Sequence, residues 1–180
     1  MDEKTKIKFN VLAIICILVF SFVITPKTLQ NDTFYTISIG EHIVENGIDR
    51  EDPFAWTELK YTYPHWLYDV ATYFVYNMGG MTGIYITTAV LSCILGIIIY
   101  ITQVKVNKNN LFSFALTMLI MFLLKDFIAA RAQLVTFILF ILEILFVECF
   151  LSSNKKRYLV GLVVISALIA NLHAAVFYVF

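Results

Sequence analysis

The sequence predicts an all-α, polytopic integral membrane protein with about five transmembrane helices. Apolar residues make up 60% of the chain and aromatic residues 16%, whereas soluble proteins are usually about 45 to 50% apolar. The mean hydropathy is +0.81. Lys and Arg fall mainly in short clusters between long apolar segments, a distribution typical of multi-span proteins. These three observations exclude a soluble globular domain.

Five apolar segments approach or exceed the length of a helix that crosses a bilayer, about 20 residues for ~30 Å of hydrocarbon. We predict transmembrane helices over residues 9–25, 83–104, 111–124, 132–151 and 158–180, in a single domain over residues 1–180. For the first helix a cleaved signal peptide is the alternative, but no small-residue cleavage pattern follows it. The last segment stops inside an apolar run, so we expect the chain to be the N-terminal part of a longer membrane protein.

The basic clusters predict which side of the membrane each loop occupies, because short loops rich in Lys and Arg stay in the cytoplasm. One cluster precedes the first segment, one separates the second from the third, and one separates the fourth from the fifth. Their members are Lys4, Lys6 and Lys8, then Lys105 and Lys108, then Lys155, Lys156 and Arg157. All three clusters lie on the same side of the membrane only if the short third segment also crosses it. We therefore predict a multi-pass membrane protein with its N-terminus in the cytoplasm.

The outer loop over residues 26–82 is long, mostly polar and acidic. Its acidic side chains are Asp32, Glu41, Glu45, Asp49, Glu51, Asp52, Glu58 and Asp69, against Lys27, Arg50 and Lys60. Nucleic acid is excluded as a partner, because binding its phosphates requires a basic patch.

Two interfacial helices are predicted inside this loop, over residues 32–46 and 64–78. Asn31 or Asp32 suits an N-cap, and Asn46-Gly47 suits a helix end. Pro64 suits the first turn of the second helix, which would break at Gly79-Gly80. Both helices would lie at the membrane surface.

Asp32, His65 and Asp69 are the candidate catalytic residues. Asp32 is the first carboxylate after the first transmembrane segment, at the level of the lipid headgroups, where it would act as a general base toward a hydroxyl. Its alternative role is to cap the helix, worth about 1 kcal/mol. His65 and Asp69 lie one turn apart and would form an acid/base pair. The alternative for this pair is a weak interaction on a wet helix face.

Glu41, Lys125, Arg131 and His173 are the candidate substrate-binding residues. The Arg131 guanidinium at the end of a span suits a lipid phosphate, and ordinary snorkelling of cations is the alternative. Glu41 either lines a site or belongs to a solvated face. His173 would form a proton path with Glu143 or, as the alternative, hydrogen bonds between helices like those expected of Asn171.

Cysteine chemistry is not expected. Cys16, Cys93 and Cys149 all lie inside predicted spans, where cysteine usually packs as a small apolar residue. We predict neither a disulfide nor a metal site.

Several short motifs follow one another in an order that resembles a known family. The outer loop holds Asp32-Thr33-Phe34-Tyr35, residues 39–48 (IGEHIVENGI) and Asp52-Pro53-Phe54-Ala55-Trp56-Thr57. His65-Trp66-Leu67, Gly79-Gly80, Arg131-Ala132-Gln133 and Ala170-Asn171-Leu172-His173 come after it. Over nearly the whole chain, this pattern resembles bacterial multi-span proteins related to the GT-C glycosyltransferases.

The resemblance implies an all-helical membrane fold in which two interfacial helices cover a cavity. A polyprenyl-phosphate-linked sugar would enter that cavity from the membrane. Asp32 would serve as base or metal contact, Arg131 would contact the lipid phosphate, and the phosphate would leave in an inverting displacement. The chain lacks the Asp-Asp pair of protein O-mannosyltransferases and a clear Asp-x-Asp or Glu-x-Asp in the second outer loop, as in oligosaccharyltransferases. A divalent metal is therefore doubtful, and no other cofactor is expected.

The predicted function is a membrane glycosyltransferase, or its N-terminal half, that moves a sugar from a polyprenyl-phosphate donor to an acceptor on the outer face. The alternative is a non-catalytic membrane component, such as a lipid-carrier-binding protein, a flippase partner or an assembly subunit. The expected partners are the polyprenyl-phosphate-linked sugar, membrane lipids, and a further membrane protein or the missing C-terminal half.

Overall fold

The computed structural model describes residues 3–49, 52–57 and 62–173, and its regular structure over these residues is entirely helical. The elements are α1 (Glu3–Ile24), α2 (Asn31–Asn46), α3 (Trp66–Asn107), α4 (Asn110–Leu124), the 3-10 turn η1 (Lys125–Phe127), α5 (Ala132–Ser153) and α6 (Arg157–Leu172). The predicted all-α class is confirmed.

Four helices are long and apolar enough to cross a membrane: α1, α3, α4 together with η1, and α5. The protein is therefore a membrane-embedded, multi-helix protein. The fifth predicted span corresponds to α6, which has 16 residues and is shorter than the about 20 that a crossing helix needs. Residues 174–180 of that predicted span lie outside the described residues.

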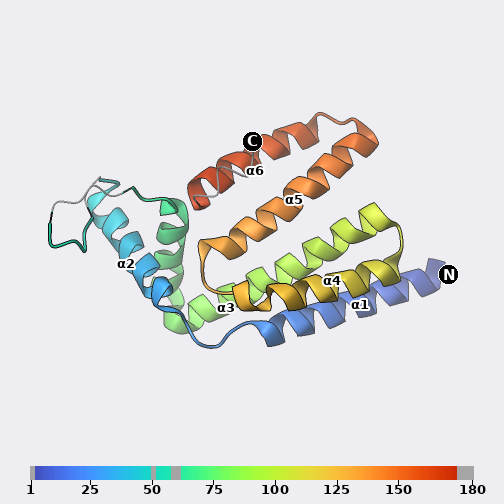
Figure 1. Cartoon of the computed structure of the whole chain (residues 1–180), viewed down its shortest axis with the longest axis horizontal. Helices are drawn as coiled ribbons and strands as arrows, with labels where there is room; N and C mark the ends of the chain where they lie inside the picture. The colour runs from blue at the N-terminus through green and yellow to red at the C-terminus, as the bar shows by residue number, and fades with distance from the viewer. Residues whose placement is uncertain (1–2, 50–51, 58–61, 174–180) are drawn as a thin grey trace.

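α3 has 42 residues and bends at Gly80, whose backbone has φ 58° and ψ −149°. Glycine adopts such a positive φ without the clash that a Cβ would cause. The bend separates a first arm, residues 66–79, from a second arm, residues 81–107. The second arm runs beside α1 and α4, whereas the first arm turns across the end of this bundle beside α2 (Figure 1). The membrane-spanning part of α3 is therefore the second arm.

The break predicted at Gly79-Gly80 is present, as a kink between two helical arms at Gly80. Its first arm begins at Trp66 rather than at Pro64, with His65 as the N-cap. α2 begins at Asn31 and ends before Gly47, which has φ 84°. Its N-cap is Gln30, without a side-chain capping bond, so the prediction that Asn31 or Asp32 caps this helix is wrong.

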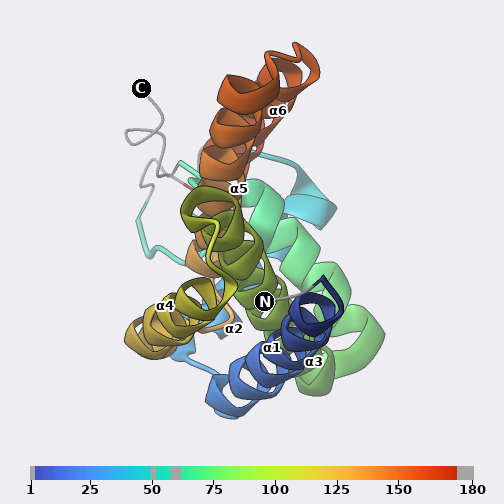
Figure 2. The same cartoon turned by 90° about the vertical axis from the view of Figure 1, so that its right-hand side faces the viewer.

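α1, the second arm of α3 and α4 form the main bundle, and α5 and α6 form a hairpin against it (Figures 1 and 2). A central cluster of fully buried side chains includes Leu95, Met121 and Leu134. Gly96 lets α1 approach closely, since a Cβ there would lie 2.7 Å from a methyl carbon of Ile17. Close packing over small residues is the usual way in which helices associate in a bilayer.

The three basic clusters of the sequence lie toward one end of the molecule. The N-terminus, the α3–α4 connection and the α5–α6 connection share that end, while α2 and the first arm of α3 lie at the other (Figure 1). α2 is held against the first arm by buried residues on one face: Thr33, Thr36, Ile37, Ile39, Gly40 and Ile43. This arrangement places α2 and the first arm of α3 over the end of the bundle that is remote from the basic clusters.

Candidate functional site

A polar cavity of ≈ 220 Å³ opens where four segments that are distant in the sequence converge. They are the first turns of α2, the start of α3, the start of α5 and the residue after α6. The lining residues are Asp32, Thr36, His65, Tyr68, Arg131, Ala132, Gln133 and His173. The α6 end is joined to the α3 start by the indole nitrogen of Trp66, which donates to Asn171 Oδ1 at 3.1 Å. The predicted interhelical hydrogen bonding of Asn171 is therefore confirmed.

Arg131 and Asp32 form an ion pair across this cavity. Arg131 Nη2 lies 2.5 Å from Asp32 Oδ2, and the neighbouring Thr33 hydroxyl donates to the Ala130 carbonyl at 3.3 Å. The first turn of α2 is thereby fastened to the segment that leads into α5. Arg131 Nε is buried and has no hydrogen-bond partner among the described residues. Because guanidinium nitrogens can only donate, this N–H is available to an acceptor atom of a ligand.

His65 and Asp69 form the second polar pair of the site. His65 Nδ1 lies 2.8 Å from both carboxylate oxygens of Asp69, and Asp69 is 0% exposed. Thr36 contributes a further side-chain hydrogen bond to this carboxylate. Burial raises the pKa of Asp69 above its usual value, and the bonds from His65 and Thr36 oppose that shift. The alternative prediction of a weak pair on a wet helix face is wrong, because α2 covers Asp69.

His173 follows the last residue of α6 and lines the cavity. Its Nδ1 is buried without a hydrogen-bond partner in the part of the chain that the structure describes. Burial lowers the pKa of His173, and the neighbouring His65 lowers it further. The imidazole is therefore kept neutral, in a form that either donates or accepts one hydrogen bond at each nitrogen.

The structure thus brings five of the seven predicted site residues together. Asp32, His65, Arg131 and His173 line one cavity, and Asp69 lies directly behind His65. Glu41 and Lys125 are not among the residues that line it. Glu41 is exposed on α2, and Lys125 Nζ pairs with Asp126 at 3.2 Å, over the Phe122 ring. These two predicted substrate contacts do not join the site.

Glu143 and His173 do not meet. Glu143 lies ten residues beyond the cavity residue Gln133 on α5, about 15 Å along a helix that rises 1.5 Å per residue. His173 lines the cavity together with Gln133. The described structure therefore gives no support to a proton path between this carboxylate and this imidazole.

Sequence reasoning missed Thr36, Tyr68 and Gln133 as cavity residues. Thr36 is four residues after Asp32, so it shares a helix face with it, and this spacing was the available signal. Gln133 belongs to the Arg131-Ala132-Gln133 motif. Tyr68 has no comparable signal, because its place depends on how the first arm of α3 packs.

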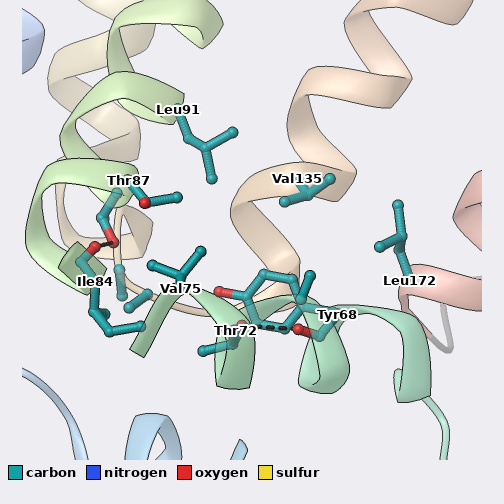
Figure 3. Close-up of a pocket in the computed structure, with 12 residues that line it drawn as sticks. Tyr68, Thr72, Val75, Ile84, Thr87, Leu91, Val135 and Leu172 are labelled. Carbon is teal, nitrogen blue, oxygen red and sulfur yellow. Dashed lines mark hydrogen bonds between the residues drawn. The ribbon is translucent and has the colours of Figure 1, made fainter. Parts of the chain in front are cut away.

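A second, apolar pocket of ≈ 150 Å³ adjoins the polar cavity and shares Tyr68 with it. It lies between the two arms of α3, the start of α5 and the end of α6 (Figure 3). Its wall includes Val75, Leu91, Val135 and Leu172. The hydroxyl of Thr72 donates to the Tyr68 carbonyl and that of Thr88 to the Ile84 carbonyl, both at 2.8 Å. Because these hydroxyls are already bonded to their own helices, the pocket offers mainly hydrocarbon to a ligand.

No group of three or more His, Cys, Asp or Glu side chains placed to hold a metal ion is found among the described residues. Comparisons with protein-family models, with curated proteins and with solved structures found no match to this chain. The functional argument therefore rests on the geometry of the two adjoining cavities.

Proposed function

We propose that this protein is a membrane glycosyltransferase, or the N-terminal part of one, that uses a polyprenyl-phosphate-linked sugar as donor. The resemblance of its motifs to GT-C glycosyltransferases suggests this class. The observation that carries the proposal is the cavity residue Arg131. One of its guanidinium nitrogens pairs with Asp32, and its buried Nε–H has no hydrogen-bond partner among the described residues. A phosphate oxygen is the acceptor that suits such a fork of donors.

The apolar pocket next to the polar cavity supports a donor that is an amphiphile. A phosphate on Arg131 would leave the attached hydrocarbon chain facing Tyr68, beyond which Val75, Leu91 and Val135 offer an apolar wall (Figure 3). A free nucleotide sugar has no apolar chain to place there. The geometry therefore favours a lipid-linked donor over a nucleotide-linked one.

The transfer would be a displacement at the anomeric carbon of the sugar. The acceptor hydroxyl oxygen bonds to this carbon as the bond to the phosphate oxygen breaks, and the lipid phosphate leaves with the electron pair. Arg131 would stabilise the charge that develops on that phosphate. Asp32, held 2.5 Å from Arg131, would keep the guanidinium oriented, and the proton of the acceptor hydroxyl would pass to a basic group of the cavity.

The outer face of a bacterial cytoplasmic membrane is the proposed location, with the N-terminus inside. The cavity is lined in part by α2 and the start of α3, which lie at the end of the bundle opposite to the basic clusters (Figure 1). Short connections rich in Lys and Arg stay cytoplasmic, so the cavity would open outside. Donors flipped across the membrane would reach it from the outer leaflet.

Asp32→Asn is expected to lower kcat/KM for sugar transfer by up to about 10²- to 10³-fold, the effect of losing one donor to a developing oxyanion, while membrane insertion stays intact. The amide keeps the shape of the carboxylate but removes the charge that pairs with Arg131. The measurement is transfer of a radiolabelled hexose from a polyprenyl-phosphate donor by the purified protein in nanodiscs. Full activity in Asp32→Asn would contradict the role of this residue. Donor binding by the wild-type protein without any transfer would favour the non-catalytic, lipid-carrier-binding alternative.

Val135→Trp is expected to weaken binding of the long-chain donor by about 10- to 200-fold, the range for a lost apolar contact in a pocket. The indole would fill the space in front of Leu91 and Val75 (Figure 3). Binding of inorganic phosphate should be unchanged, because the polar cavity is not filled. Val160→Trp is the matched control, since Val160 is 64% exposed on α6. Equal donor affinity in both variants would remove the apolar pocket from the donor site.

A further inference from the structure

The His65–Asp69 pair is the most completely enclosed polar contact of the site. Both Asp69 oxygens lie 2.8 Å from His65 Nδ1, and Asp69 is 0% exposed. α2 closes over it, because Thr36 bonds to the carboxylate and Gly40 packs so closely on α3 that a Cβ there would clash with Tyr73 Cβ, at 2.8 Å. His65 and Thr36 therefore enclose the Asp69 carboxylate, which cannot itself contact a ligand.

This contact fixes which nitrogen of His65 carries the proton. A carboxylate only accepts hydrogen bonds, so Nδ1 is the protonated nitrogen and Nε2 keeps its lone pair. The His65 side chain is 25% exposed and lines the polar cavity. The basic nitrogen is thus presented on the side where a ligand would bind.

Asp32 is the other group of the cavity that could take a proton. Its carboxylate is already paired with the Arg131 guanidinium at 2.5 Å, so it is engaged in holding that side chain. Among the described residues, the charged or titratable groups around His65 are Asp69 from its own helix, Asp32 from α2, Arg131 before α5 and His173 after α6, with Tyr68 beside it. The one of these that His65 contacts through a hydrogen bond is the Asp69 carboxylate.

Resting on the proposed function, we propose that His65 is the catalytic base of the transfer and that Asp69 is its positioning residue. The acceptor hydroxyl gives its proton to His65 Nε2 as its oxygen bonds to the anomeric carbon. The bond from that carbon to the donor phosphate breaks, and the phosphate leaves with the electron pair on Arg131. The imidazolium that forms is stabilised by the buried Asp69 carboxylate, and Asp32 acts by holding Arg131.

The tautomer of His65 tests the pair without any substrate. In the ¹⁵N spectrum of imidazole-labelled protein in detergent micelles, assigned with His→Gln variants, His65 should carry its proton on Nδ1 at neutral pH. Asp69→Asn should shift His65 toward the Nε2–H form, the more usual one for a free imidazole. Protonation of His65 on Nε2 alone in the wild-type protein would overturn the proposal. This measurement needs no variant of Asp69.

A second histidine–aspartate pair of the chain provides the matched control. His42 Nε2 lies 3.0 Å from Asp49 Oδ2, at the far end of α2 from the cavity. Asp49→Asn should change the His42 signals and leave those of His65 as they are. Asp69→Asn should do the reverse. A response of His65 to both substitutions would show a general change of the fold and would overturn the assignment of its tautomer to Asp69.

Kinetics separate a base from a structural residue. With a polyprenyl-phosphate hexose as donor, His65→Gln and Asp69→Asn should lower kcat by about 10²- to 10⁴-fold, the usual contribution of general base catalysis, at an unchanged donor KM. A loss of kcat/KM that comes only from a higher donor KM, with kcat unchanged, would overturn the base role. Absence of transfer by the wild-type protein would instead contradict the proposed function, while the tautomer measurement would still decide whether His65 presents a basic Nε2.

Discussion

Arg131→Gln should lower kcat/KM for sugar transfer by about 10²- to 10³-fold, the loss seen when one donor to a developing oxyanion is removed. Glutamine keeps a polar side chain at the N-cap of α5 but lacks both the charge and the forked donors. Asp32 loses its partner, yet its side chain is 63% exposed and stays solvated. A half-exposed pair of this kind contributes little to stability, so the fold should be retained.

Lys125→Gln is the matched control for this prediction. It removes one positive charge from the same connection between α4 and α5, but Lys125 pairs with Asp126 outside the cavity. The measurement is transfer in nanodiscs, with thermal unfolding recorded in parallel for each variant. Equal losses in Arg131→Gln and Lys125→Gln would assign the effect to surface charge. Arg131→Lys should fall between wild type and Arg131→Gln, since an ammonium keeps the charge without the planar fork.

The membrane helices and four of the cavity residues were predictable from sequence because the bilayer restricts where polar groups occur. Charged side chains are rare in apolar segments, so Arg131 at the edge of one was conspicuous. Asp32 was likewise conspicuous as the first carboxylate after an apolar segment, and His65 because it lies one helical turn before Asp69. The bend of α3 was predictable from Gly79-Gly80, because only glycine takes the backbone conformation found at Gly80 without strain.

The burial of Asp69 could not be predicted from helical spacing. The spacing places Asp69 and Thr72 on one polar face of the first arm of α3, and a polar face is expected to meet water. In the structure both residues are buried, Asp69 beneath α2 and Thr72 in the wall of the apolar pocket. Contacts between segments that are distant in the sequence bury these two residues, and the spacing of residues within one helix does not predict such contacts.

The same limit explains Glu41 and Lys125. Both have the charge expected of a substrate contact, but charge alone does not say which side of a helix or connection faces a cavity. α2 turns the face with Asp32 and Thr36 toward the site and leaves Glu41 exposed. The apolar pocket was also not predicted, because it exists only where the two arms of α3 diverge next to α5 (Figure 3).

Gly40→Ala should destabilise the protein by about 1 to 3 kcal/mol, the usual cost of overpacking a close contact. A Cβ at this position would collide with the Asp69 carbonyl oxygen and lie 2.8 Å from Tyr73 Cβ. These are backbone and near-backbone atoms, which cannot yield as the tip of a flexible side chain does. α2 would therefore have to move away from the first arm of α3, uncovering the carboxylate that Thr36 and His65 share.

Gly79→Ala is the control, because Gly79 also lies in a helix but has nothing within 4 Å of a Cβ built on it. Alanine leaves the unfolded chain less conformational freedom than glycine does. This variant should therefore be neutral or more stable by about 0.5 to 1 kcal/mol. Thermal unfolding in detergent measures both changes, and the His65 tautomer reports the site. A Gly40→Ala protein that unfolds at the wild-type temperature would show that α2 does not pack as closely as the contact requires. Loss of the Nδ1–H tautomer in Gly40→Ala, and not in Gly79→Ala, would show that packing of α2 on Asp69 is what orients His65.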